Sequence, residues 1–198
     1  MSPHKRKLGP LERLFPMPCV LIASGPLDNP GILTAAWINV VASTPPSLVV
    51  GLRENRHTLA HIQETGCFSV NIPSTPLVAQ VDYLGMATGN NGVNKLAETD
   101  LTVSAGEHGI MPLINECLYN LECIVSDTNI VGSYHVVTAE IVQTYADESI
   151  LTSDEGTLVS MEALDPLIYI AGNREYRALG EKVADAYSIG KSLDNRHK

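Results

Sequence analysis

The sequence predicts a mainly β protein whose antiparallel strands close into a barrel, with a few short helices and a C-terminal helix. Apolar runs rich in Val, Ile and Tyr alternate with tight-turn formers, which gives about six or seven strands and few helices. No glycine-rich dinucleotide fingerprint follows these runs, which argues against a doubly wound parallel sheet. Because the 198 residues contain neither a repeat nor a low-complexity tract, we expect a single domain over residues 1–198.

Charge and hydrophobicity exclude several classes of protein. With 22 acidic and 13 basic residues, the formal net charge is -9, which would repel a nucleic-acid backbone. No apolar run approaches the roughly 18 residues of a membrane span. Near the start of the chain, Glu12, Arg13 and Pro16 interrupt what would be the apolar region of a secretory signal. We therefore expect a cytoplasmic protein that binds neither nucleic acid nor membrane.

Four strands are predicted in the first half of the chain, over residues 17–24, 32–41, 47–53 and 67–72. Residues 27–31 are dense in turn formers and return the chain antiparallel. Pro45-Pro46 ends the second strand, because proline cannot donate a hydrogen bond to a β ladder.

A short helix is expected after the third of these strands, because Leu59 and Ile62 lie three residues apart. Either Thr58 or Asn55 is expected to cap the start of this helix. Gly66 is expected to end it.

The next part of the chain predicts a helix, a loop and a hairpin. Ser74-Thr75-Pro76 is typical of a helix start with a hydroxyl cap and a proline in the first turn. Residues 89–95 form a loop rich in glycine and asparagine that could wander or wrap a ligand. The runs over residues 116–125 and 134–145 are rich in Val, Ile and Tyr with Gly132 between them, so they predict a hairpin.

A C-terminal amphipathic helix is predicted from apolar residues at helical spacing, with Gly190 as its end. These residues are Tyr176, Leu179, Val183 and Tyr187.

The cysteines and histidines predict neither a disulfide nor a metal site. The four cysteines lie in apolar runs and are interpreted as buried, reduced thiols, namely Cys19, Cys67, Cys117 and Cys123. A redox pair of Cys117 with Cys123 is the weaker alternative. His57 and His61 have a spacing that can bind a metal, but no third ligand is identifiable, so helix-surface histidines are preferred.

Several short motifs follow one another along nearly the whole chain. They are Thr34-Ala35-Ala36-Trp37, Ser43-Thr44-Pro45-Pro46, residues 52–58, residues 68–74, residues 89–95, Leu121-Glu122-Cys123, residues 139–142 and residues 176–191. No single motif is specific, but in this order they resemble the flavin reductase-like family of FMN-binding split barrels, and most closely its flavoredoxin branch.

The resemblance implies an antiparallel FMN-binding split β-barrel of Greek-key type. It further implies a homodimer that holds one FMN per subunit near the subunit interface and passes electrons or hydride, with a redox partner protein or NAD(P)H as the electron source. The first hypothesis is therefore a flavoredoxin-like redox protein in which FMN supplies the chemistry, so no residue is expected to be catalytic. The alternatives are an NAD(P)H-dependent flavin reductase that supplies reduced FMN to a partner, and a cofactor-free barrel that acts as an interaction module.

The resemblance places the isoalloxazine ring against Thr34, Ala35, Ala36 and Trp37. The two alanines let the main chain approach the ring, although ordinary strand packing is the alternative for both. Trp37 either borders the ring or is a core aromatic residue whose N–H is satisfied. Ser43, in the turn that follows, is also assigned to the cofactor site.

Arg53, His57 and Thr58 are expected to bind the phosphate at a helix start, where the helix dipole favours an anion. The alternative is that Arg53 is a solvated charge at a strand end and Thr58 a helix cap. Arg56 is expected to face solvent instead.

Three further residues are assigned to the cofactor site. Asn71 and Ser74 are implied to point toward the ribityl chain or the phosphate, with turn and cap roles as the alternative. Lys95 could supply a second cation, although most surface lysines bind no ligand.

One motif departs from the family pattern. Gly132-Ser133-Tyr134 stands where many flavin reductases of the family show Gly-Asp-His, with the histidine beside the flavin. This departure weighs against direct oxidation of NAD(P)H. Tyr134 itself either lines the flavin face or is an ordinary strand aromatic.

Overall fold

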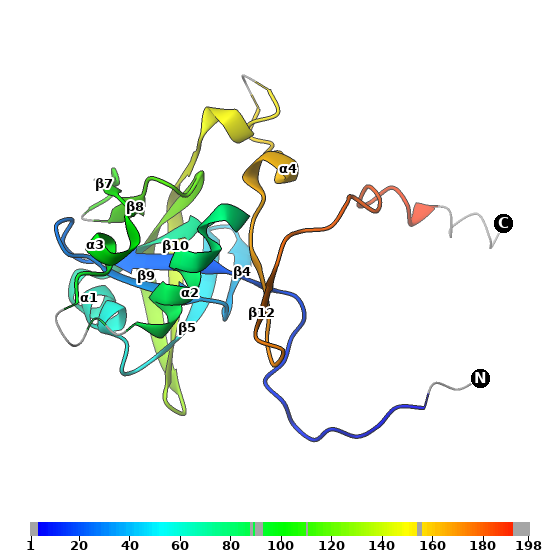
Figure 1. The fold of residues 1–198 in the computed structure, drawn as a ribbon, viewed down its shortest axis with the longest axis horizontal. Coiled ribbons are helices and arrows are strands. Elements are labelled where there is room, and N and C mark those ends of the chain that lie inside the picture. Colours follow the sequence, from blue (N-terminus) through cyan, green and yellow to red (C-terminus); the bar gives the residue numbers. More distant parts are fainter. Residues whose placement is uncertain (1–3, 88, 90–92, 110, 154–155, 192–198) are drawn as a thin grey trace.

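A computed structural model describes residues 4–87, 89, 93–109, 111–153 and 156–191. Its centre is a curved seven-stranded antiparallel sheet with the strand order β3-β2-β6-β9-β10-β5-β4 (Figure 1). The strands are β2 (Val20–Ser24), β3 (Gly31–Ala35), β4 (Ile38–Ser43), β5 (Pro46–Arg53), β6 (Cys67–Ile72), β9 (Tyr119–Val131) and β10 (Tyr134–Ala146). The mainly β, antiparallel fold with few helices is thus confirmed, as are the hairpin on either side of Gly132 and the strand over residues 67–72.

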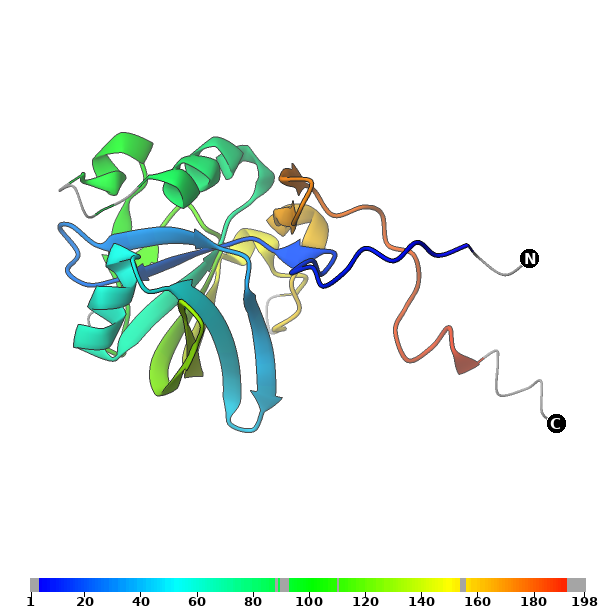
Figure 2. The ribbon, with the colours of Figure 1, turned by 90° about the horizontal axis from the view of Figure 1, so that it is seen from below.

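The single strand predicted over residues 32–41 is wrong, because the chain breaks at Ala36 and Trp37. Strand β3, before the break, pairs with β2, and β4, after it, pairs with β5. These two consecutive strands therefore stand at opposite edges of the seven-stranded sheet. The carbonyl of Trp37 accepts a hydrogen bond from the Gly51 amide at 2.8 Å. The chain itself thus crosses from one edge of the sheet to the other (Figure 2), and we call this place, where β3 and β4 do not pair with each other, the barrel seam.

Two hydrophobic clusters cover the two faces of the sheet. Alternate residues of the strands, such as Ile22 and Phe68, fill the barrel interior, and helix α1 (His57–Thr65) adds Leu59 and Ile62 to this cluster. The second cluster lies on the other face of β2 and β3, where helix α2 (Val78–Met86) contributes Val81. Each of these strands is therefore buried on both sides, which explains their continuous apolar sequence.

The remaining elements are short. They are β1 (Met17–Pro18), β7 (Val103–Ala105), β8 (Pro112–Ile114), β11 (Ile168–Ile170), β12 (Glu175–Arg177), helices α3 (Lys95–Thr99) and α4 (Met161–Leu164), and the 3-10 turns Thr75–Leu77 and Glu148–Ile150. The described residues contain twelve strands, more than the six or seven that the sequence predicts. Runs of two or three residues are too short to show an alternating pattern.

The helix caps differ from the prediction. Helix α1 begins after Arg56, which makes no side-chain capping bond, and Thr58 is a buried residue of the first turn. Neither Thr58 nor Asn55 is therefore the cap. Gly66 ends the helix as predicted, with φ at 70° and its amide donating to the Ile62 carbonyl at 2.9 Å. Ser74 precedes a 3-10 turn and makes no side-chain capping bond either.

The predicted C-terminal helix is wrong. Tyr176 lies in strand β12, which pairs with β11, and residues 176–187 are not helical. Val183 and Tyr187 are both 98% exposed. Both terminal segments leave the body of the molecule on the same side (Figures 1 and 2), and at 98% exposure Val183 and Tyr187 pack against no apolar face. A helix with this spacing needs such a face to pack against.

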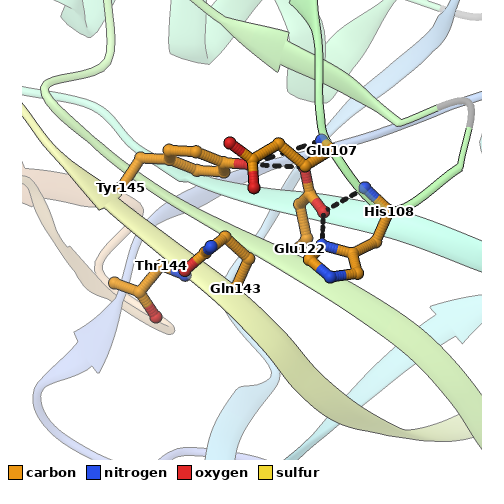
Figure 3. A network of polar contacts seen from close by, with 6 residues as sticks. All are labelled: Glu107, His108, Glu122, Gln143, Thr144 and Tyr145. Atoms are coloured by element: carbon orange, nitrogen blue, oxygen red, sulfur yellow. Dashed lines mark hydrogen bonds and ion pairs between the residues drawn. The ribbon is translucent and has the colours of Figure 1, made fainter.

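A buried carboxylate fixes the loop after β7 to the sheet (Figure 3). Glu122 on β9 is fully buried and accepts hydrogen bonds from the His108 amide at 2.8 Å and from the Tyr145 hydroxyl at 3.0 Å. It also accepts from the Glu107 amide, and its Oε2 lies 2.9 Å from Nδ1 of His108. Burial alone would raise the pKa of Glu122, but these hydrogen bonds outweigh burial and lower it. Near Gln143, beside this network, the pairing of β9 with β10 shifts register.

All four cysteines are buried, as predicted, and none forms a disulfide. Burial raises the pKa of Cys19, Cys117 and Cys123 to about 12, so these thiols stay protonated near neutral pH. Cys117 and Cys123 belong to different hydrophobic clusters.

Candidate functional site

A cavity of about 230 Å³ opens at the barrel seam, and we call it the seam cavity. Strands β3 and β5 and the break between β3 and β4 form one wall, which includes Ala35, Ala36 and Gly51. At these three positions the side chain is small or absent, which leaves room for a ligand to approach the backbone. Thr34 also lines the cavity, but its hydroxyl donates to the Val81 carbonyl.

Aromatic and cationic side chains form the rim of the seam cavity. The rings of Trp37 and Tyr134 meet edge to face with their centroids 5.5 Å apart. The guanidinium Nε of Arg53 donates to the Tyr134 hydroxyl at 2.8 Å. Because Trp37 is 44% exposed, it is not a core aromatic residue. Its ring can therefore face a ligand in the cavity.

The opposite wall comes from α2, β11 and β12, and sequence reasoning missed it. It presents Asp82, Gly85 and Met86 from α2 together with Tyr169 and Tyr176. The Tyr176 hydroxyl donates to Oδ1 of Asp82 at 3.0 Å. Burial, followed by this hydrogen bond, raises the pKa of Tyr176. The two residues lie 94 positions apart, so no local sequence signal joins them.

A second, smaller cavity of about 90 Å³ lies at the start of α1, and we call it the polar cavity. Its lining includes His57, Thr58 and Lys95. Lys95 begins helix α3 and is only 6% exposed, contrary to the expectation of a loop lysine. Its Nζ donates to the carbonyls of Ile32 at 2.8 Å and Leu84 at 3.3 Å. In the described part of the chain, no carboxylate forms an ion pair with it.

The positive charges of the polar cavity act on one another. Burial, followed by the nearby Arg56, lowers the pKa of Lys95 to about 8. Burial, followed by His61 and Lys95, lowers the pKa of His57. A bound anion would relieve both effects, because it compensates the charge that burial disfavours.

Arg56 joins the two cavities, since it and Leu33 line both. Its Nη1 donates to the Gly85 carbonyl at 3.1 Å, and the side chain is half-buried. The expectation that Arg56 faces solvent is therefore wrong. The two cavities therefore lie side by side, one mainly apolar and the other cationic.

Two glycines allow the backbone to approach the helix start closely. A Cβ on Gly31 would lie 2.9 Å from the Thr58 Cα, and one on Gly89 would lie 3.1 Å from Nδ1 of His57. The predicted wrapping by the rest of the loop over residues 90–92 lies outside the described residues. The site thus combines a wall with small residues, a buried ammonium group without a carboxylate partner among the described residues, and the start of a helix. The wall suits a flat ring, and the ammonium and the helix start suit a phosphate.

The structure does not bring every predicted residue to these cavities. Asn71 is fully buried, donates to the Leu21 carbonyl at 3.2 Å and lines neither cavity. Ser74 forms an isolated β-bridge with Pro166. Ser43 is exposed beside the β4–β5 turn. Asn71 makes packing contacts within strand β6 and Ser74 makes no side-chain capping bond, so neither has the turn or cap role given as the alternative, and the assignment of all three residues to the cofactor site stays a prediction.

Comparison with known proteins adds a family to this geometry. Residues 11–180 match the family described as flavin reductase like domain. The chain belongs to the flavin reductase-like family. This membership agrees with the resemblance seen in the short motifs. The matched residues include those that line both cavities.

Solved structures of similar proteins share the whole fold. Flavoredoxin of Desulfovibrio vulgaris (Miyazaki F) is 34% identical, with a TM-score of 0.86 over 94% of this chain and 100% of its own. Flavoredoxin from Methanosarcina acetivorans is 30% identical, with a TM-score of 0.88 over 96% of this chain and 100% of its own. A split barrel domain protein from Shewanella frigidimarina is 18% identical, with a TM-score of 0.77 over 88% of this chain and 87% of its own. This last likeness concerns the fold alone, and it confirms the split barrel.

The described residues also bear on metal binding and on membrane insertion. No group of three or more His, Cys, Asp or Glu side chains gathers there as a metal site. The rings of His57 and His61 instead meet edge to face, with their centroids 4.6 Å apart. No helix of the described ranges has the length and apolar character needed to cross a membrane.

Proposed function

We propose that this flavin reductase-like protein is an FMN-binding redox protein that transfers electrons or hydride through the bound flavin. The observation that carries the proposal is that the seam cavity and the polar cavity lie side by side, with Arg56 and Leu33 lining both. An apolar slot beside a buried cation suits a planar ring and its phosphate. Within the described residues Lys95 has no carboxylate partner, and the phosphate would supply its counter-charge.

Each part of the site has a task in this proposal. Lys95 and the start of α1 bind the phosphate, while Ala35 and Ala36 offer backbone groups to the ring edge. Trp37 and Tyr134 restrict access of water from the rim. Bound FMN supplies the hydride or electron transfer, so the protein contributes binding, orientation and electrostatics.

Electron transfer from a partner, as in a flavoredoxin-like protein, is preferred to direct oxidation of NAD(P)H. The two flavoredoxins cover nearly the whole chain at 34% and 30% identity. At the rim, Tyr134 is held by Arg53 where many reductases of the family have a histidine. We therefore expect bound FMN to respond to a reduced protein donor and to be indifferent to NADH and NADPH.

Anaerobic absorbance spectra of the purified protein with FMN test this function. Binding should quench FMN fluorescence at micromolar concentration, and a reduced protein donor should bleach the visible absorption of the flavin. Rapid bleaching by NADH with release of FMN would favour the flavin reductase alternative instead. Protein that stays colourless and leaves FMN fluorescence unchanged would contradict both flavin functions.

We also propose that the protein acts as a homodimer in the cytoplasm. Leu179, Val183 and Tyr187 are exposed on the C-terminal segment, and a groove between residues 11–18 and β4 shares Ala36 and Trp37 with the seam cavity. A second copy that covers these surfaces would bury them beside the flavin. Light scattering should give a dimer for the full chain and a monomer after truncation at Arg177. A full chain that is monomeric at micromolar concentration would contradict the dimer.

A further inference from the structure

The hydrogen bond between Tyr176 and Asp82 places a carboxylate in the wall of the seam cavity. Asp82 comes from α2 and Tyr176 from β12, and both line the cavity. Because the phenol donates its proton to Oδ1, the phenol oxygen and Oδ2 of the carboxylate remain hydrogen-bond acceptors. Among the described residues that line this cavity, Asp82 is the only carboxylate.

The two cations that line the same cavity, Arg53 and Arg56, form no ion pair with Asp82 within the described residues. Arg53 donates to Tyr134 on the rim, and Arg56 donates to the Gly85 carbonyl. Cys19 and Tyr169 also line this wall, and burial keeps the Cys19 thiol neutral by raising its pKa to about 12. In the described part of the chain, no ion pair neutralises Asp82. Its negative charge therefore acts on whatever ring occupies the cavity.

We propose that Asp82, positioned by Tyr176, lowers the reduction potential of the bound flavin. This inference rests on the proposed function, since it concerns FMN in the seam cavity. Reduction by two electrons with uptake of one proton leaves a negative charge on the ring, which a carboxylate in the same cavity repels. Asp82 therefore favours the oxidised over the reduced form and makes the reduced protein a stronger electron donor. Tyr176 is a positioning residue, because it holds the carboxylate at the wall.

The reduction potential of FMN-loaded protein tests this role by titration against reference dyes. Asp82→Asn keeps the shape and removes the charge. Charges in one cavity interact with an effective dielectric constant of about 20, so we expect roughly a tenfold gain in affinity for reduced over oxidised FMN. For a two-electron couple, a tenfold change corresponds to a rise of about 30 mV.

Two further variants separate charge from packing. Tyr176→Phe keeps the carboxylate and removes its donor, so its potential should stay at or below that of the wild type. Glu175→Gln makes the same charge change on the neighbouring residue of β12, where the carboxylate pairs with Arg177 outside the seam cavity, and should leave the potential unchanged. A generic packing disturbance would not give this order of potentials.

The outcomes distinguish this inference from the proposed function. A raised potential in Asp82→Asn alone supports the tuning role. If Asp82→Asn binds FMN but its potential does not rise, the inference is overturned while FMN binding stands. If the wild type binds no FMN, the proposed function itself fails. Fluorescence titration with oxidised FMN before each measurement makes this distinction.

Discussion

Replacing Lys95 with methionine tests the phosphate end of the site. The ammonium is 6% exposed and has two backbone carbonyls as partners, so a dianionic phosphate would be its strongest partner. A hydrogen bond to a charged group contributes about 1.5–3 kcal/mol, which corresponds to roughly a 10- to 100-fold change in affinity. We expect Lys95→Met to lose FMN affinity by this factor and to keep its affinity for riboflavin, which lacks the phosphate.

The lowered pKa of Lys95 adds a pH signature to this prediction. With a pKa of about 8, the ammonium form of the free protein falls from about 90% at pH 7 to about 10% at pH 9. Binding of phosphate requires the charged form, so FMN affinity should weaken about tenfold over this interval. The phosphate is already doubly ionised above pH 7, because its second pKa is about 6, and does not contribute.

The same pKa shift should make the FMN-free protein more stable as the pH rises, whereas it weakens FMN binding. Lys95 has a folded-state pKa of about 8, below the ordinary 10.5, so the unfolded chain binds more protons between these values. The Lys95 contribution to the free energy of unfolding of the FMN-free protein should therefore rise from pH 8 to 10.5. Lys95→Met should lack this rise.

Fluorescence titrations of FMN and riboflavin at pH 7, 8 and 9 measure the binding effects. Lys182→Met is the matched control, because Lys182 is exposed and pairs with Asp185 on the C-terminal segment. It changes the net charge equally and should bind like the wild type. Equal losses for FMN and riboflavin in Lys95→Met, or a wild-type FMN affinity that is constant from pH 7 to 9, would refute the role of Lys95.

Three other outcomes follow from the structure. Arg56→Met should weaken the binding of FMN about tenfold more than the binding of riboflavin, because Arg56 lines the polar cavity. Arg53→Met should weaken the binding of both flavins alike, because Arg53 lines only the seam cavity. The reverse order in the same titrations would contradict this assignment. Glu122→Gln should lower the free energy of unfolding by about 2 kcal/mol in denaturant melts. Because the pKa of Glu122 is lowered, the wild type should lose this advantage as the pH falls below the ordinary 4.5, and the exposed Glu64→Gln should show neither effect. The four thiols should react with a disulfide reagent only after unfolding, and rapid reaction of the folded protein would refute their burial.

Long strands were predictable because their pattern is local. Residues 67–72 form a continuous apolar run between turn formers, and strand β6 has these same bounds. The β9–β10 hairpin was likewise evident from two long β-rich runs around Gly132. In both, the residues that face the core and those that form the ladder lie within one short window.

The site was only partly predictable, because its decisive features depend on distant parts of the chain. Residues 34–37 were expected at the ring, and the structure places all four on the seam cavity. The apolar run over residues 32–41 does not reveal the break at Trp37. The break depends on the strands with which the two halves of the run pair, β2 for β3 and β5 for β4. Lys95 is buried only because α3 packs near β3. Asp82 meets Tyr176 only once β12 has returned to α2.

The C-terminal segment shows why a correct pattern can give a wrong structure. Its apolar residues have helical spacing, yet Val183 and Tyr187 are 98% exposed. An isolated helix of about 12–15 residues is marginal in water, so this segment needs an apolar surface to fold upon. The segment leaves the body of the molecule (Figure 2), and these two side chains pack against no apolar surface of this chain. In the proposed homodimer, a second copy would supply that surface beside the groove that shares Ala36 and Trp37 with the seam cavity.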